Sequence, residues 1–187
     1  MLPSAVGFSD PLLSSGFALT LRGIQRLAQA MERQSPPSLA ALAEYGEAVQ
    51  KDQEAANLLV AALHRNLGKP SLFNQLLMVY FASVSYAETA MRFNHSELCP
   101  GFLLNGRADY WPKVANLLRE RLDGTIESAG FDLRVREAIA EVNLCDWLSE
   151  PHRRCYGVDR DAMIHSWKRF GASATEISEL GARLGVL

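Results

Sequence analysis

The residues best suited to chemistry lie near the start of the chain, where the stretch from Gly7 to Gly16 is GFSDPLLSSG. Ser14, Ser15 and Gly16 stand at the predicted beginning of a helix, whose first backbone N–H groups have no partner within the helix. Such a helix start carries about half a positive charge and attracts anions or polarised carbonyl groups. Glycine lets a flat ligand approach the backbone closely. The pattern therefore suits an anion-binding or carbonyl-binding helix start.

A purely structural interpretation of the same residues is that Ser14 or Ser15 caps the helix and that Asp10-Pro11 makes an ordinary turn. Serine is common just before a helix because its hydroxyl accepts a hydrogen bond from the first turn. The spacing alone favours this interpretation over a ligand site, and both stay open at the level of the residues.

The composition is typical of one folded domain. The chain has 187 residues, of which 48% are hydrophobic and 21% charged, and its formal net charge is −2. This balance favours neither disorder nor a nucleic-acid-binding surface. A membrane-spanning helix needs about 20 uninterrupted apolar residues, and the most apolar stretch, 72–91, contains several polar side chains. We therefore expect no nucleic acid partner and no membrane span.

The three cysteines, Cys99, Cys145 and Cys155, form no CxxC pair. Neither a disulfide framework nor a zinc site is therefore predicted. His152 and Cys155 are three residues apart and could share one helix face, but further ligands at suitable spacing are absent. The N-terminal residues also lack the pattern of a secretory signal. We expect a reduced, cytoplasmic protein that holds no metal.

Helical signals dominate the chain, and no strand with convincing alternation of apolar and polar residues is visible. The predicted fold is mainly α, an irregular bundle of about six helices preceded by an N-terminal loop. Residues 1–16 form this loop, and residues 17–187 form a single helical region. The first helix carries one apolar stripe at steps of three and four residues, made by Phe17, Leu21, Ile24, Leu27, Ala28 and Met31.

Prolines and capping residues predict where the helices begin and end. The first helix should stop near Ser35-Pro36-Pro37, since proline cannot continue a helix, and Ser38 can cap the second. Ser173 and Glu176 have the spacing of a capping box for the last helix. The second helix has an alternating three- and four-residue seam, typical of nearly parallel packing, at Leu39, Leu42, Gly46, Val49, Gln53, Ala56, Val60 and Leu63.

The third predicted helix, which begins at Pro70 or Ser71, is apolar nearly all round and should be the most buried element. It also carries Tyr80, Tyr86 and Glu88, which could line a substrate cavity, although aromatic residues at helical spacing more often belong to the core.

Two histidines, His64 and His95, lie near predicted helix ends, where histidine usually satisfies terminal carbonyl groups. We therefore predict a structural role for both histidines.

The stretch GFSDPLLSSGFALTLRGIQRLA, from Gly7 to Ala28, closely resembles the G-F-x-D-P-L-x-S-T-G-x-x-x-[TA] signature of a family of flavoenzymes. These are the FAD-dependent oxidoreductases of the tryptophan-halogenase and geranylgeranyl-reductase-like superfamily. The stretch NLCDWLSEPHRRCYGVD, from Asn143 to Asp159, is more weakly similar to a run in the carboxyl-terminal part of halogenase-like members. The resemblance implies that most of this chain corresponds to the carboxyl-terminal part of such an enzyme.

In that family the signature loop lies against the isoalloxazine ring of FAD. The resemblance implies that Asp10 and Pro11 shape the flavin-side loop, and that the segment Ser14-Ser15-Gly16 faces the pyrimidine edge. A helix start stabilises the negative charge that reduced flavin carries there. In halogenating members the corresponding Ser-Thr-Gly also contributes to a halide site, and Ser15 stands where threonine is usual. The implied cofactor-binding residues are Gly7, Asp10, Pro11, Ser14, Ser15 and Gly16.

Other motifs of a complete flavoenzyme are absent from the sequence. It contains neither the G-x-G-x-x-G turn on a βαβ unit that holds a dinucleotide nor the W-x-W-x-I-P motif of tryptophan halogenases. No catalytic residue can be assigned. We expect the chain to lack the N-terminal dinucleotide-binding part, to bind FAD weakly alone, and to work with a separate dinucleotide-binding polypeptide. The expected reaction is oxidation, monooxygenation, reduction or halogenation of an organic small molecule.

An alternative is a free-standing helical interaction or dimerisation domain that has lost cofactor binding. A large surface that another domain once covered would be sticky, so both hypotheses predict self-association.

Overall fold

The computed structural model describes residues 3–7, 10–125, 130–144 and 164–185. Within these ranges the chain is mainly helical and contains no strand, which confirms the predicted fold class. Six of the described helices have nine residues or more: α2 (Ser15–Arg33), α3 (Leu39–Arg65), α4 (Pro70–Arg92), α5 (Trp111–Asp123), α6 (Phe131–Ile139) and α8 (Ala174–Leu184). The short elements are α1 (Pro3–Val6) and the 3-10 helices η1 (Pro11–Leu13), η2 (Ser96–Leu98), η3 (Phe102–Leu104) and η5 (Trp167–Phe170).

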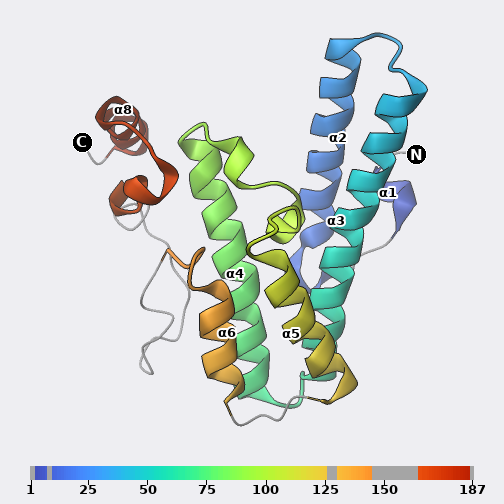
Figure 1. Ribbon diagram of the computed structural model, residues 1–187, viewed down its shortest axis with the longest axis vertical. Coiled ribbons are helices and arrows are strands. Elements are labelled where there is room, and N and C mark those ends of the chain that lie inside the picture. The colour runs from blue at the N-terminus through green and yellow to red at the C-terminus, as the bar shows by residue number, and fades with distance from the viewer. Residues whose placement is uncertain (1–2, 8–9, 126–129, 145–163, 186–187) are drawn as a thin grey trace.

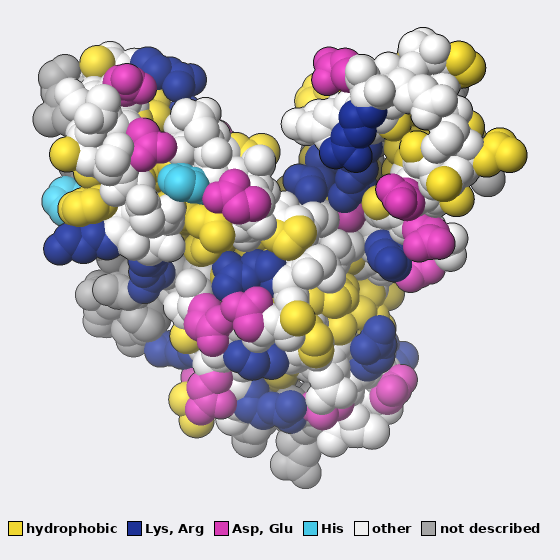
Figure 2. All heavy atoms as spheres, turned by 45° about the horizontal axis from the view of Figure 1, so that its top comes forward, with side chains coloured by type: hydrophobic (Ala, Val, Ile, Leu, Met, Phe, Trp, Pro, Cys, Tyr) yellow, Lys and Arg dark blue, Asp and Glu magenta, His cyan; other side chains and the backbone are white. Residues whose placement is uncertain are grey.

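Two arms rise from a common body (Figure 1). One arm is an antiparallel hairpin of α2 and α3, whose tip stands clear of the other helices. The second arm contains the C-terminal end of α4 and, beyond it, α8. Figure 2 shows a hollow between the arms, with Lys and Arg side chains on the inner side of the α2–α3 arm.

The body is held by one apolar core between α3, α4, α5 and α6. Each of these helices turns large buried side chains inward, and Phe170 of η5 extends the core by packing on Tyr86 of α4, with ring centroids 4.8 Å apart. Representative core residues are Leu59, Leu63, Leu76, Val79, Val114, Leu118, Phe131 and Ile139.

The predicted helix boundaries are confirmed where capping residues define them. Helix α2 ends at Arg33, ahead of the prolines, and Ser38 caps α3 by accepting a hydrogen bond from the Ala41 N–H at 3.1 Å. At α8 the capping box is complete, because Ser173 Oγ accepts from the Glu176 N–H and a Glu176 carboxylate oxygen accepts from the Ser173 N–H at 2.7 Å.

The apolar stripe of α2 faces solvent. An amphipathic helix normally packs such a stripe on the core, yet Phe17 is 72% exposed, Ile24 52% and Met31 49%. The buried positions of α2 lie on a different side: Ser15, Leu19 and Gly23. The hairpin arm therefore presents a row of uncovered hydrophobic side chains.

The packing of α3 and α4 is also less uniform than their sequences indicate. The seam of α3 is buried from Val49 onwards, whereas Leu39 and Leu42 are exposed near the hairpin tip. Helix α4 is not buried all round, because Phe81 and Met91 are exposed.

Candidate functional site

The signature loop is shaped by the side chain of Asp10. Its Oδ1 accepts a hydrogen bond from the Leu12 N–H at 2.9 Å, which closes a turn leading into η1. Pro11 is the first residue of η1, where its restricted φ angle suits the helical conformation. The Leu12 N–H stabilises the ionised carboxylate and lowers the pKa of Asp10 below its usual value, and His64 adds to this effect.

Two side chains from the bundle hold the loop in place. His64 Nε2 of α3 lies 3.4 Å from Asp10 Oδ1, and Tyr80 Oη of α4 donates a hydrogen bond to the Leu13 carbonyl at 3.2 Å. His64 thus faces a carboxylate rather than terminal carbonyl groups. His95 behaves similarly, with Nδ1 2.9 Å from Glu97 Oε1. Residues 10–13 of the loop are therefore held against α3 and α4.

The start of α2 differs from an ordinary serine-capped helix. Ser14 occupies the N-cap position, but its backbone is left-handed (φ 51°, ψ 24°) and its side chain makes no capping hydrogen bond. A left-handed conformation costs a residue other than glycine roughly 1–2 kcal/mol. Ser15 is already the first residue of the helix. The interpretation that one of these serine side chains caps α2 is therefore wrong, because the backbone at Ser14 turns into the helix without it.

Ser15 is a buried polar residue without a hydrogen-bond partner among the described residues. Its exposed fraction is 1%, and its hydroxyl oxygen makes no hydrogen bond to any described residue. A buried hydroxyl left unpaired costs about 1–3 kcal/mol. The fold thus keeps an unsatisfied polar atom at the positive end of a 19-residue helix.

The two glycines of the motif have different explanations. A Cβ added at Gly7 would lie 3.2 Å from Gln53 Cγ, so close packing on α3 accounts for glycine there. A Cβ at Gly16 would meet nothing within 4 Å, and the backbone at Gly16 is not left-handed. Within the described part of the chain, neither packing nor backbone conformation requires glycine at position 16. No described residue fills the space above it.

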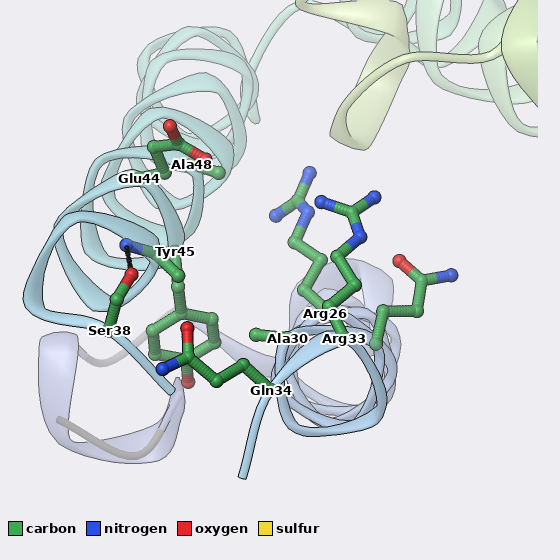
Figure 3. Close-up of a pocket in the computed structure, with 10 residues that line it drawn as sticks. Arg26, Ala30, Arg33, Gln34, Ser38, Glu44, Tyr45 and Ala48 are labelled. Carbon is green, nitrogen blue, oxygen red and sulfur yellow. Dashed lines mark hydrogen bonds between the residues drawn. The ribbon is translucent and has the colours of Figure 1, made fainter. Parts of the chain in front are cut away.

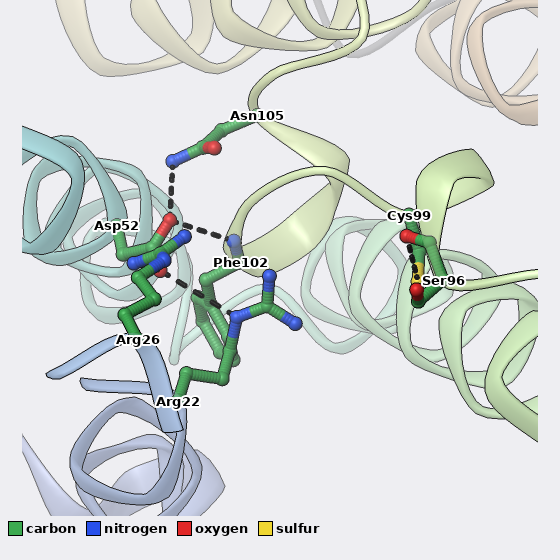
Figure 4. A network of polar contacts seen from close by, with 7 residues as sticks. All are labelled: Arg22, Arg26, Asp52, Ser96, Cys99, Phe102 and Asn105. Carbon is green, nitrogen blue, oxygen red and sulfur yellow. Dashed lines mark hydrogen bonds and ion pairs between the residues drawn. The ribbon is translucent and has the colours of Figure 1, made fainter. Parts of the chain in front are cut away.

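A second polar cluster lies beside α2, centred on Asp52 of α3 (Figure 4). Asp52 Oδ2 lies 2.6 Å from Arg26 Nη1 and 3.5 Å from Arg22 Nε, both on α2. Asp52 Oδ1 accepts hydrogen bonds from the Phe102 N–H at 2.7 Å and from Asn105 Nδ2 at 3.1 Å. The carboxylate therefore joins α2, α3 and the loop around η3.

Gly101 allows this loop to approach Asp52. Its φ angle is +77°, and a Cβ there would lie 1.6 Å from Asn105 Oδ1 and 3.2 Å from Asp52 Oδ1. The sequence interpretation missed this cluster. The available signal was an acidic residue, Asp52, three positions after Val49 on the buried side of the second helix.

A cavity of about 370 Å³ lies between α2 and α3 near the hairpin tip, and Figure 3 shows its lining. Arg26 and Arg33 line it from α2, and Glu44 and Tyr45 line it from α3. Burial raises the pKa of the Tyr45 hydroxyl. Since α2 rises 1.5 Å per residue, Arg26 is about 17 Å along the helix from Ser15. This cavity is therefore separate from the signature loop.

The remaining candidate residues lie in the core, in a groove or outside the described residues. Tyr86 belongs to the core, as aromatic spacing predicted, whereas Tyr80 and Glu88 line a groove between α2 and α4. Cys99 is buried, and this burial raises its pKa. Outside the described residues lie Cys145, His152, Cys155 and the part of the second family-like stretch that follows Leu144.

Across the described ranges, no three His, Cys, Asp or Glu side chains come together in a way that would hold a metal ion. None of the helices in the same ranges is long and apolar enough to cross a membrane. Comparison of the chain with protein-family models, with curated proteins and with solved structures found no match. The flavoenzyme resemblance therefore stays a prediction that rests on the motif residues.

Proposed function

We propose that this chain is the flavin-loop and substrate-side portion of an FAD-dependent oxidoreductase, of the monooxygenase or halogenase-like type. A separate dinucleotide-binding polypeptide would hold the rest of the cofactor. The observation that supports the proposal most strongly is the start of α2, where, among the described residues, none pairs with the buried Ser15 hydroxyl and none fills the space above Gly16.

These residues fit the pyrimidine edge of a flavin in charge and in shape. The helix start favours negative charge, and the Ser15 hydroxyl, which protein atoms cover in this structure, would turn outward to donate one hydrogen bond to a carbonyl oxygen. Gly16 presents backbone rather than a side chain to a flat ring. Bound FAD would supply hydride or electron transfer to an organic substrate. The part of the chain described here would orient the ring through a loop that His64 and Tyr80 fix in advance.

The exposed stripe of α2 supports the need for a partner. Phe17, Ile24 and Met31 extend from the signature loop along one side of the helix, and contiguous exposed apolar surface marks interaction sites. A dinucleotide-binding polypeptide that covered this stripe would be placed directly beside the loop.

Flavin retention tests the proposal. The chain is mixed with FAD, alone and with the polypeptide encoded immediately upstream, and flavin absorbance is measured after desalting. We expect flavin to be retained only in the three-component mixture and to be lost with Gly16→Leu, whose side chain would fill the open space.

Gly46→Leu is the matched control, because a Cβ at Gly46 in α3 also meets nothing within 4 Å. Equal retention by the two variants, or no retention in any mixture, would overturn the flavin proposal.

The alternative function, a helical dimerisation domain, is favoured by the same exposed stripe. It predicts that Ile24→Glu abolishes self-association measured by light scattering, while Leu133→Glu on α6, at a 58% exposed position, leaves it unchanged. A stable dimer that retains no flavin in any mixture would select this alternative.

A further inference from the structure

A groove of about 400 Å³ lies between α2 and α4. This volume is within the range of small-molecule sites, which are mostly apolar with a few placed polar groups. The walls are mainly apolar and come from α2, from α4 and from the loop at η3: Ala18, Leu21, Val84, Ala87, Met91 and Phe102.

Arg22 supplies the groove with a charged group. Its Nε lies 3.5 Å from Asp52 Oδ2, which is an ion-pair distance but too long for a good hydrogen bond. Figure 4 shows that the two terminal nitrogens of Arg22 point away from Asp52. No hydrogen bond or ion pair joins these nitrogens to any residue in the described ranges. The side chain is only 24% exposed.

The negative charge of Asp52 is balanced without Arg22. Arg26 pairs with Asp52 at 2.6 Å, and the Phe102 N–H and Asn105 donate to its other oxygen. One carboxylate thus faces two guanidinium groups, which leaves one positive charge in excess.

The other carboxylate at this groove is Glu88, and Arg92 pairs with it at 2.6 Å. The groove therefore combines an apolar wall with a guanidinium group whose two terminal nitrogens have no partner among the described residues.

We propose that this groove binds a small organic acid with an aromatic or branched aliphatic body. The body would pack between α2 and α4, and the carboxylate would accept two hydrogen bonds from the terminal nitrogens of Arg22. Arginine suits this contact because its planar group matches the two oxygens of a carboxylate.

The groove adjoins the signature loop. Tyr80 lines the groove and also donates to the Leu13 carbonyl in the loop. A molecule in the groove would thus lie close to the start of α2. The groove is proposed to bind organic acids whether or not the chain binds flavin. Only the further step, that such an acid is the substrate, rests on the proposed flavin function.

Calorimetric titration of the full chain, without flavin, tests the inference. The probes are 2-naphthylacetate and its neutral amide, 2-naphthylacetamide, which differ in charge but hardly in shape. Because a hydrogen bond to a charged group is worth more than a neutral one, we expect the amide to bind about tenfold more weakly or worse. Equal affinity for the two probes, or no binding of the acid, would overturn the proposal.

Two arginine variants separate direct contact from an indirect effect. Arg22→Gln should weaken acid binding by about tenfold and leave amide binding nearly unchanged. Arg26→Gln is the matched control, because Arg26 holds the same Asp52 but does not line this groove. Equal losses in the two variants would assign the effect to the Asp52 cluster and overturn the direct contact.

Ala87→Leu keeps the test decisive if Arg22→Gln fails to fold. It adds bulk to the groove wall without changing charge, and it should abolish binding of both probes. Unchanged binding would place the probes elsewhere. Since none of these titrations uses flavin, their failure is distinct from failure of the flavin-retention test.

Discussion

Two buried polar side chains, Asp52 on α3 and Ser15 on α2, differ in their hydrogen bonding. Asp52 is 2% exposed, and both of its oxygens have close partners in Arg26, the Phe102 N–H and Asn105. Ser15 is 1% exposed, and its hydroxyl has none among the described residues. A paired buried group stabilises a fold, whereas an unpaired one costs stability. The difference shows that the fold uses the Asp52 carboxylate in hydrogen bonds and ion pairs, whereas no described residue uses the Ser15 hydroxyl.

The largest expected effect comes from removing the paired group. Asp52→Ala should lower the free energy of unfolding by about 3 kcal/mol, because it leaves Arg26 and the Phe102 N–H without their acceptor. Urea denaturation measures this change. The neighbouring exposed variant Glu54→Ala should change stability by less than about 0.5 kcal/mol. Similar losses in both variants would show that Asp52 does not organise this region.

Two glycines extend the comparison to the backbone. Gly101→Ala should cost about 2 kcal/mol, because its φ angle is +77° and the new Cβ would displace Asn105 from Asp52. Gly16→Ala should stay within about 0.5 kcal/mol of the parent protein, since its Cβ enters open space. Thermal unfolding of both variants checks this prediction. A large loss at Gly16 would mean that glycine there serves the fold.

Two serines give a smaller contrast of the same kind. Ser83 Oγ is 2.7 Å from both the Val79 carbonyl and Tyr110 Oη, so Ser83→Ala should lower the free energy of unfolding by about 1 kcal/mol. Ser15→Ala removes an unpaired hydroxyl and should leave stability unchanged or raise it by up to about 1 kcal/mol. Chemical denaturation of the two variants measures these changes. A larger loss of unfolding free energy in Ser15→Ala than in Ser83→Ala would contradict this account.

The smallest expected effect is the pH dependence of the loop. The Leu12 N–H lowers the pKa of Asp10 below the usual 3.8, so the ionised carboxylate is favoured in the folded loop. This stabilisation is complete above the unfolded-state pKa and is lost as the pH falls through the lowered folded-state value. The NMR shift of the Leu12 amide should titrate below pH 3.8 and become flat in Asp10→Asn. A midpoint at or above the usual value would argue against the turn.

Much of the fold could be predicted because its signals are local. Prolines stop α2, Ser38 caps α3, and the Ser173–Glu176 box begins α8, and each depends only on residues within one helical turn. These local signals could not predict that the apolar stripe of α2 faces solvent. Periodicity shows that Phe17 and Ile24 share a face, but it does not say what that face packs against.

The candidate site was only partly accessible to prediction for the same reason. The motif located the helix start, but the left-handed Ser14 and the buried Ser15 depend on α3 and α4 holding the loop. The Asp52 cluster joins residues about 50 positions apart, such as Asp52 and Phe102. No short sequence pattern records a contact of that range.

The most direct test of the central claim is an NMR titration of the isotopically labelled chain with FAD up to about 1 mM, a range suited to weak binding. The account predicts that the amide signals of Ser15, Gly16 and Phe17 shift most, and that Gly16→Leu removes these shifts while Gly46→Leu preserves them. Unchanged signals at the start of α2, or larger shifts elsewhere in the chain, would contradict a flavin site at this helix.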